Sequence, residues 1–248
     1  MKTMISMMAV SAAIAAAANA AVVTQWTFEG DTTNPAFGAG SASLIGGTSA
    51  TFATGTGSPA GRAWNTSTYK AQGTGSGEAG VQFLASTASA SGGFGGISVS
   101  FEHRASGTNS RWAQVDYTLD GGVTWVTGYW NNSGGLSPHD TFYTFTVDFS
   151  SVVGANNNAG FGFRIVSIFS PQAFDQSSTL GAYAANTAYM RANAGAVYSP
   201  LTSTATGDYG TSGTWRFDNV TINGTAIPAP GALALLGAAG LVGSRRRR

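Results

Sequence analysis

Few side chains in this sequence are suited to acid–base or nucleophilic catalysis. The two histidines are His103, in Glu102-His103-Arg104 at the end of an expected strand, and His139, in a Ser-Pro-His-Asp turn, and there is no cysteine. Neither the Gly-x-Ser-x-Gly nucleophile elbow nor the His-Glu-x-x-His zinc motif occurs. Glycoside hydrolysis needs two carboxylates at a set separation, and Glu78 and Glu102 are candidates only because glutamates are few. A carbohydrate-active hydrolase or lyase is therefore the alternative to a non-enzymatic function.

Aromatic side chains beside amides are the stronger functional signal. Sugars stack on flat aromatic rings, while polar side chains hold their hydroxyl groups. Tyr129, Trp130 and Asn131 stand together at the expected end of a strand and are our candidate ligand-binding residues. Other available rings are Trp64, Trp112 and Trp125. The alternative is burial, which is the commoner fate of tryptophan in a β-sandwich.

The composition excludes several classes of protein. Charged residues make up 9% of the chain, against about a quarter in typical proteins, and glycine accounts for 35 of 248 residues. Between residues 21 and 227 there are seven basic and eleven acidic residues, a net charge of about −4. A nucleic-acid partner is therefore excluded, because a phosphate-binding face needs clustered Lys and Arg. Without cysteine, neither disulfides nor thiolate metal sites are available.

Short alternating segments predict an all-β fold. Apolar residues alternate with polar ones or cluster in short runs between turn-rich gaps, and no long stretch has helical periodicity. About nine strands are expected: residues 22–28, 42–45, 81–85, 97–101, 115–119, 123–130, 143–149, 161–165 and 215–222. The glycine-rich range 38–80 is expected to be mostly loop, and residues 170–213 form a long segment with weak strand character. We predict a single antiparallel β-sandwich.

One turn carries a recognisable motif. Residues 118–125, Thr-Leu-Asp-Gly-Gly-Val-Thr-Trp, match the Asp-box pattern Ser/Thr-x-Asp-x-Gly-x-Thr-Trp. Asp120 can accept backbone hydrogen bonds within the turn, and the two glycines allow positive φ. In sialidase-like proteins the Asp box is structural, and we interpret the single copy here as a stable hairpin turn.

The two ends of the expected domain resemble those of the jelly-roll domains in extracellular carbohydrate-binding modules. The resemblance rests on Trp26-Thr27-Phe28-Glu29-Gly30-Asp31 after the first strand and on the last strand, residues 215–222. It implies a jelly-roll-like sandwich whose first and last strands pair, with a structural calcium between their acids. Glu29, Asp31 and Asp218 are the candidate ligands, since calcium prefers carboxylate oxygens. The alternative is that Asp218 pairs with Arg216 or a nearby backbone amide, while Glu29 and Asp31 are solvated.

The N-terminus has the pattern of a secretory signal peptide. Lys2 provides the positive charge, and residues 4–18 form a short apolar stretch. Ala18-Asn19-Ala20 fits the small-x-small cleavage rule, so the mature chain is expected to begin at Ala21 after export by the Sec machinery. The alternative is a permanent N-terminal anchor.

The C-terminus has three successive parts. Pro228, Ala229, Pro230 and Gly231 form a stiff break, residues 232–242 are apolar, and four basic residues close the chain: Arg245, Arg246, Arg247 and Arg248. As a helix, the 13 residues 231–243 would span roughly 20 Å, less than the ~30 Å hydrocarbon core of a bilayer. The arginines would stay on the cytoplasmic side by the positive-inside rule. This order indicates a transient membrane anchor; an unprocessed short anchor is the alternative.

This tail resembles the PEP-CTERM sorting signal of Gram-negative bacteria, over residues 227–248 only. The resemblance implies recognition and processing by an exosortase, a membrane protease, in a bacterium that makes exopolysaccharide. Ala229 stands where the family usually has glutamate, so the cleavage details are open.

Together these features predict a signal peptide (residues 1–20), a β-sandwich ectodomain (21–226) and a hydrophobic sorting helix within the tail (227–248). The expected protein is exported to the cell envelope, cell surface or extracellular matrix, where it binds exopolysaccharide. A purely structural matrix component is the remaining alternative.

Overall fold

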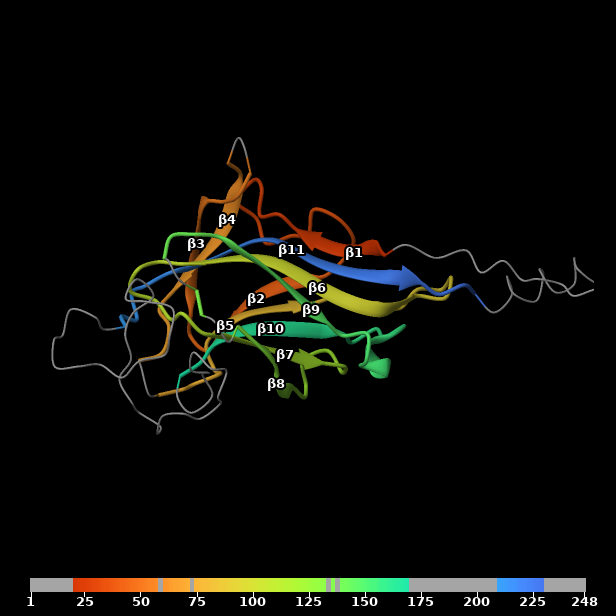
Figure 1. Ribbon diagram of the computed structural model, residues 1–248. Coiled ribbons are helices and arrows are strands. Elements are labelled where there is room, and N and C mark those ends of the chain that lie inside the picture. The colour runs from red at the N-terminus through yellow and green to blue at the C-terminus, as the bar shows by residue number, and fades with distance from the viewer. Residues whose placement is uncertain are drawn as a thin grey trace, which may run out of the picture.

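The computed structural model describes residues 20–57, 60–71, 74–132, 135–136, 139–169 and 209–229, which form two antiparallel β-sheets packed face to face (Figure 1). One sheet has six strands: β1 (Ala21–Trp26), β3 (Ser49–Thr54), β4 (Arg62–Ser67), β6 (Phe94–Ala105), β9 (Tyr143–Asp148) and β11 (Trp215–Ala226). The other has five: β2 (Ser41–Ile45), β5 (Gly80–Leu84), β7 (Ala113–Thr118), β8 (Val126–Asn131) and β10 (Gly162–Ser167). A single 3-10 turn, Val153–Ala155, is the only helical element in the described ranges. The predicted all-β sandwich is confirmed.

The strand order joins the two ends of the domain. The six-stranded sheet runs β3-β4-β11-β6-β9, with β1 also paired to β11, and the five-stranded sheet runs β2-β5-β10-β7-β8. Ala21 lies opposite Gly224, so β1 begins beside the end of β11 at one end of the sandwich (Figure 1). The expected pairing of first and last strands is therefore confirmed.

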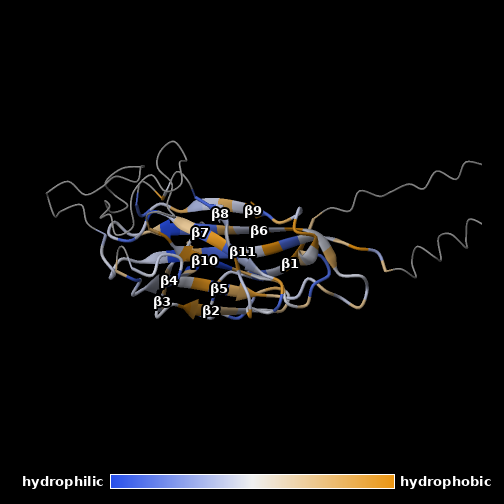
Figure 2. Ribbon diagram, turned by 90° about the horizontal axis from the view of Figure 1, so that it is seen from below, coloured by the Kyte–Doolittle hydropathy of each residue, from blue (hydrophilic) through white to orange (hydrophobic). Residues whose placement is uncertain are grey.

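The core follows from the alternation of side chains along each strand. Val81 and Phe83 on β5, and Phe163 and Ile165 on β10, are fully buried between the sheets. The Phe83 ring lies 5.1 Å, centroid to centroid, from the Trp26 ring of the other sheet. Intervening residues face outward, which produces the alternating colours along the five-stranded sheet in Figure 2. Burial of one face of each sheet fixes the register, because a one-residue slip would expose the apolar set.

Two strands lie where the sequence indicated loop. β3 and β4, within the glycine-rich range 38–80, form a pair and join β11 through Phe217 opposite Trp64. Their sequences, SATFAT and RAWNTS, are rich in Ala, Ser and Asn, so their strand signal is weak. They become strands because pairing satisfies backbone groups of β11 that would otherwise lie unpaired.

The described residues include only part of the expected signal-peptide cleavage site and part of the expected sorting tail. Ala20, Ala21, Pro228 and Ala229 are described, whereas Ala18, Pro230, Gly231 and the four terminal arginines lie outside it, as do the signal peptide's apolar stretch and the sorting helix. None of the helical structure in the described residues is long and apolar enough to cross a bilayer. Most of the segment 170–213 is also outside the described residues.

A histidine is buried in the aromatic core. His103 on β6 is 0% exposed, and its ring stacks on Phe217 with centroids 4.6 Å apart and meets Trp215 edge-on at 4.5 Å. Neither ring nitrogen has a hydrogen-bond partner. Burial therefore lowers the pKa of His103 to about 3. The folded state holds this imidazole neutral, and His103, a residue first considered for chemistry, is part of the core.

We predict that acid destabilises the fold through His103. The unfolded chain takes up this proton near pH 6.5 and the folded chain only near pH 3. The free energy of unfolding should therefore fall by up to about 1.4 kcal/mol per pH unit as pH drops below 6.5. His103→Phe should remove this slope between pH 7 and 5, measured by urea denaturation. His139→Gln, at a histidine whose side chain is 38% exposed, is the control; equal slopes in wild type and His103→Phe would contradict the prediction.

Candidate functional site

A polar row crosses the outer face of the five-stranded sheet. Gln82 on β5 lies opposite Arg164 on β10, and Arg164 lies opposite Asp116 on β7. Residues directly opposite each other share a face of the sheet, and the buried neighbours of these three point into the core. The row therefore faces away from the other sheet.

Asp116 is the anchor of this row. It is 0% exposed, and its carboxylate accepts hydrogen bonds from Arg164 Nε at 2.8 Å, Gln114 Nε2 at 2.7 Å and the Gly128 backbone N–H at 2.8 Å. The Arg164 side chain is 20% exposed. A buried carboxylate with three donors holds the guanidinium in one orientation, as a preorganised binding group requires.

The Asp-box turn, residues 118–125, is held by hydrogen bonds around Asp120. Thr118 Oγ1 donates to Asp120 at 2.7 Å, and Asp120 accepts from the Thr124 backbone N–H at 2.9 Å. These bonds lower the pKa of Asp120 to about 2, with the Thr124 hydroxyl as the largest cause. Gly121 and Gly122 have φ of 74° and 93°, as expected for the turn. The predicted hairpin is confirmed, although β8 begins at Val126 rather than at residue 123.

Trp125 lies between the turn and the polar row. Its indole N–H donates to the Gly122 carbonyl at 3.1 Å, and the Arg164 guanidinium carbon lies 4.7 Å from the ring centroid. This is a cation–π contact, and the ring is half-buried. A half-buried, immobilised indole beside a fixed guanidinium is suited to stacking against a planar or sugar ligand.

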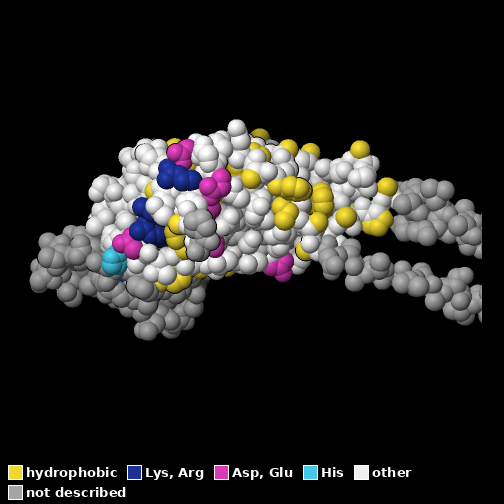
Figure 3. Space-filling model, turned by 90° about the horizontal axis from the view of Figure 1, so that it is seen from above, with side chains coloured by type: hydrophobic (Ala, Val, Ile, Leu, Met, Phe, Trp, Pro, Cys, Tyr) yellow, Lys and Arg dark blue, Asp and Glu magenta, His cyan; other side chains and the backbone are white. Residues whose placement is uncertain are grey.

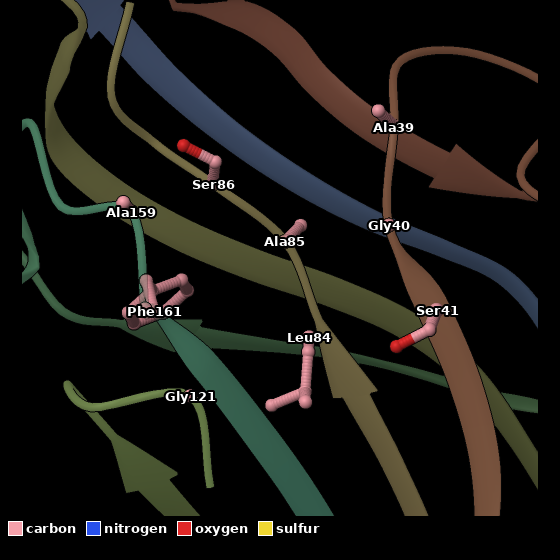
Figure 4. Close-up of a pocket in the computed structure, with 10 residues that line it drawn as sticks. Ala39, Gly40, Ser41, Leu84, Ala85, Ser86, Gly121, Ala159 and Phe161 are labelled. Carbon is pink, nitrogen blue, oxygen red and sulfur yellow. The ribbon is translucent and has the colours of Figure 1, made fainter.

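A hollow of about 340 Å³ adjoins this group (Figure 4). Its wall comes from the start of β2, the end of β5, the Asp-box turn and the start of β10. The lining residues are Ala39, Gly40, Ser41, Leu84, Ala85, Ser86, Gly121, Ala159, Gly160 and Phe161. The hollow and the polar row thus share one face of the five-stranded sheet.

Two of the three residues predicted to bind a ligand, Tyr129 and Trp130, lie elsewhere. Trp130 is opposite Val115, and its ring contacts Phe101 and Phe145 of the other sheet at 6.2 and 5.2 Å. It therefore faces the interior. The Tyr129 ring stacks on Phe149 at 4.6 Å, and its hydroxyl donates to the Asp148 carbonyl at 2.6 Å. Asn131, by contrast, ends β8 opposite Gln114, which donates to Asp116, so Asn131 lies on the outer face beside the polar row. Of the other rings, Trp64 and Trp112 are buried and Trp125 is on the outer face.

The three acids predicted to hold calcium do not converge. Asp31 pairs with the Arg62 guanidinium at 2.6 Å, and Glu29 accepts from the Arg62 backbone N–H at 2.8 Å. Asp218 accepts instead from the backbone N–H groups of Thr56 and Asn219. Within the described ranges no three acidic or histidine side chains gather as a metal site. N–H donors of the chain itself occupy all three carboxylates, and the calcium site stays a prediction from the sequence. Figure 3, which views the molecule from above Figure 1, shows most of the charged side chains on that side gathered at one end.

A different carboxylate pair forms on the six-stranded sheet. Asp218 lies opposite Glu102, and the Thr56 hydroxyl is within hydrogen-bond reach of both carboxylates. The Asn219 amide closes the cluster by donating to Glu102 at 2.7 Å. Burial raises the pKa of Asp218, and the charge of Glu102 adds to this shift. Backbone and side-chain donors enclose the pair, so it is a structural link between the loop after β3 and the sheet.

Gln82, Arg164 and Asp116 were not identified as site residues from the sequence. The available signal was a charged residue between apolar ones on two strands, Phe163-Arg164-Ile165 and Val115-Asp116-Tyr117. Alternation places each charge on an outer face. It does not say that the two strands are neighbours.

Comparisons with known proteins give distant structural likeness only. No family model matches the chain, and no curated protein does. The CBM22-1-CBM22-2 tandem domain of Paenibacillus barcinonensis Xyn10C aligns with TM-score 0.45 and 12% identity, over 82% of this chain and 50% of that one. Its CBM22-2 xylan-binding domain alone gives TM-score 0.42 and 12% identity, over 82% and 98%.

Two further proteins show the same level of likeness. An exo-beta-agarase gives TM-score 0.42 and 12% identity, over 74% of this chain and 23% of the enzyme. The family 11 carbohydrate-binding module of Clostridium thermocellum, solved with a beta-1,3-1,4-mixed-linked tetrasaccharide, gives 0.36 and 12%, over 84% and 99%. The chain spans half of the tandem domain and nearly all of each single module. At TM-scores below 0.5, ligand and activity are not carried over from these proteins.

We predict that Asp116 is essential for the stability of this face. Asp116→Ala should lower the free energy of unfolding by about 3–5 kcal/mol, because it leaves the partly buried Arg164 without its buried counter-charge. Asp148→Ala, at an exposed carboxylate that accepts from Ser150 N–H at 2.8 Å, should cost about 1 kcal/mol or less. Both are measured by urea denaturation, and equal losses in the two variants would contradict the assigned role.

Proposed function

We propose that this chain is an exported cell-surface or extracellular-matrix protein that binds a polysaccharide on the outer face of its five-stranded sheet. The observation that carries the proposal is the arrangement of Trp125, Arg164 and Gln82 on that face. The indole supplies a stacking surface, and the guanidinium and amide supply hydrogen-bond donors for hydroxyl or carboxylate oxygens. Asp116 holds the Arg164 guanidinium in place, and the Asp-box turn holds the Trp125 indole in place, before any ligand arrives. Such preorganisation lowers the entropic cost of binding.

Export and sorting are proposed from the sequence of the two ends. The signal peptide directs the chain through the Sec machinery, and the tail from residue 227 enters the membrane transiently as an exosortase substrate. The domain suits this route. Ala21 and Gly224 pair at one end of the sandwich, so the signal peptide and the sorting tail can both be removed without cutting a strand in two. The mature protein then remains at the cell surface or in the matrix.

A non-enzymatic function fits the site better than hydrolysis. None of the ten residues that line the hollow is Asp, Glu or His. The Glu102–Asp218 pair lies on the other sheet and is enclosed by Thr56 and Asn219. A purely structural matrix role would need neither the half-buried indole nor the fixed guanidinium beside it.

We predict that Trp125 is required for polysaccharide binding. The purified chain should be retarded in affinity gels containing at least one polysaccharide from a panel of neutral and acidic types. Trp125→Ala should weaken that binding roughly thirtyfold, since removal of an aromatic anchor typically costs about 2 kcal/mol. Trp125→Tyr should retain most of it because a ring is preserved.

Two controls make this experiment decisive. Val123→Ala removes an 81%-exposed apolar side chain from the same turn and should leave binding unchanged. Unfolding curves for each variant separate loss of binding from loss of structure. If no polysaccharide retards the wild-type chain, the binding function is wrong and a structural matrix role takes its place.

The sorting tail is testable independently of binding. Replacing Arg245–Arg248 with serine should block processing, because the basic cluster holds the tail in its membrane orientation. The intact mass of the exported protein, measured by mass spectrometry in a strain with exosortase, should lack the C-terminal residues in wild type and retain them in the variant. Identical masses for wild type in strains with and without exosortase would rule out this processing.

A further inference from the structure

The hollow beside the polar row has a chemistry of its own. Its ten lining residues include no charged side chain, and the largest side chain that reaches its surface is Leu84, because Phe161 is 0% exposed (Figure 4). The rest are alanine, glycine and two serines. By contrast, the adjoining row consists of Gln82, Arg164 and Asp116. One face of the sheet therefore offers two adjacent environments, one polar and one largely apolar.

The walls of the hollow are fixed by the backbone. The Ala85 N–H donates to the Phe161 carbonyl at 3.0 Å, and the Gly121 N–H donates to the Gly160 carbonyl at 2.9 Å. A Cβ on Gly160 would lie 2.7 Å from the Gly121 nitrogen, so glycine is required for this approach. These two wall amides are already paired, so apart from the hydroxyls of Ser41 and Ser86 the hollow presents little that a hydroxyl group could bind. A hydroxyl placed there would lose its hydrogen bonds to water.

The hollow adjoins the proposed stacking ring directly. A Cβ built on Gly122 would lie 3.6 Å from Gln82 Nε2, 3.6 Å from Trp125 Cζ2 and 3.9 Å from Leu84 Cδ1. The amide, the indole edge and the leucine therefore meet around one glycine. Leu84 is also part of the hollow's wall. A sugar ring against Trp125 would thus have its substituent within reach of the hollow.

From this juxtaposition we infer that the hollow is a subsite for a methyl group carried by the bound sugar, either in an O-acetyl ester or as C6 of a 6-deoxy sugar. The inference rests on the proposed polysaccharide binding and specifies its ligand class. The indole and the polar row hold the ring and its hydroxyls, while the hollow takes the apolar substituent. Transfer of the methyl from water into the hollow favours the substituted sugar over the plain one by roughly fourfold per methyl.

Matched ligands test the inference on the purified full-length chain. Affinity electrophoresis compares acetylated glucomannan with its alkali-deacetylated form, and acetylated xylan with deacetylated xylan. Competition by L-fucose against L-galactose, which differ in the C6 hydroxyl, distinguishes a 6-deoxy methyl from an acetyl. At least one pair should show roughly fourfold or greater preference for the methyl-bearing member.

Filling the hollow gives a second, independent readout. Ser41 is exposed on the edge strand β2 and lines the hollow, so Ser41→Leu should occupy it and abolish the preference while leaving binding of the unsubstituted ligand intact. Thr51→Leu, at an exposed position on the edge strand β3 of the other sheet, is the matched control and should keep the preference.

The outcomes separate this inference from the proposed function. Binding that depends on Trp125 but shows no preference in any pair overturns the methyl subsite and leaves polysaccharide binding standing. A preference that survives Ser41→Leu also overturns it, because the methyl is then recognised elsewhere. If no polysaccharide binds the wild-type chain at all, both proposals fall together.

Discussion

The last strand, β11, is the constraint on which the rest of the sandwich depends. It pairs with β6 along one edge, and with β4 and then β1 along the other. Its inward side chains Trp215, Phe217, Val220 and Ile222 are all fully buried. Pairing Ala21 with Gly224 closes a loop of about 200 residues, whose entropic cost is repaid only when these side chains are buried. The six-stranded sheet is therefore completed by residues from both ends of the domain.

The irregularities of β11 also determine where polar groups lie. The register with β6 shifts between Asp218 and Thr221, where Asn219 has a positive φ of 46°. The shift brings the Asn219 amide toward Glu102 and Thr56, so the carboxylate pair is closed by hydrogen bonds. The local bulge thus closes the cluster of Glu102 and Asp218 with hydrogen bonds from Asn219.

The five-stranded sheet depends on the same packing but uses its outer face differently. Its inner face supplies Phe83, Phe163 and Val115 to the core, and this leaves Gln82, Arg164 and Asp116 pointing outward. The Asp-box turn then positions Trp125 against Arg164. Rigidity at the site comes from one buried carboxylate and one tight turn. This explains how a chain with few charged residues can build a preorganised polar face.

Local patterns in the sequence predicted the β-sandwich, most of its strands and the Asp-box hairpin: alternation with period two, turn residues, and a short motif. The pairing of the first and last strands was implied by the resemblance to jelly-roll domains and not by any local pattern. β3 and β4 were not predicted because Ala, Ser and Asn are weak strand signals, and these strands form only where β4 pairs with β11 and β3 with β4. The signal peptide and the sorting tail remain predictions from the sequence.

Only the tertiary structure decided which polar residues meet. Arg164 and Asp116 are 48 residues apart, and they pair because β10 and β7 are neighbours in register. The orientation of Trp130 toward the core, and of Trp125 away from it, likewise follows from which face of β7 and β8 is buried. Local alternation tells which residues share a face of one strand. The order and register of strands depend on burying both sheets at once, and no segment of the sequence carries that information by itself.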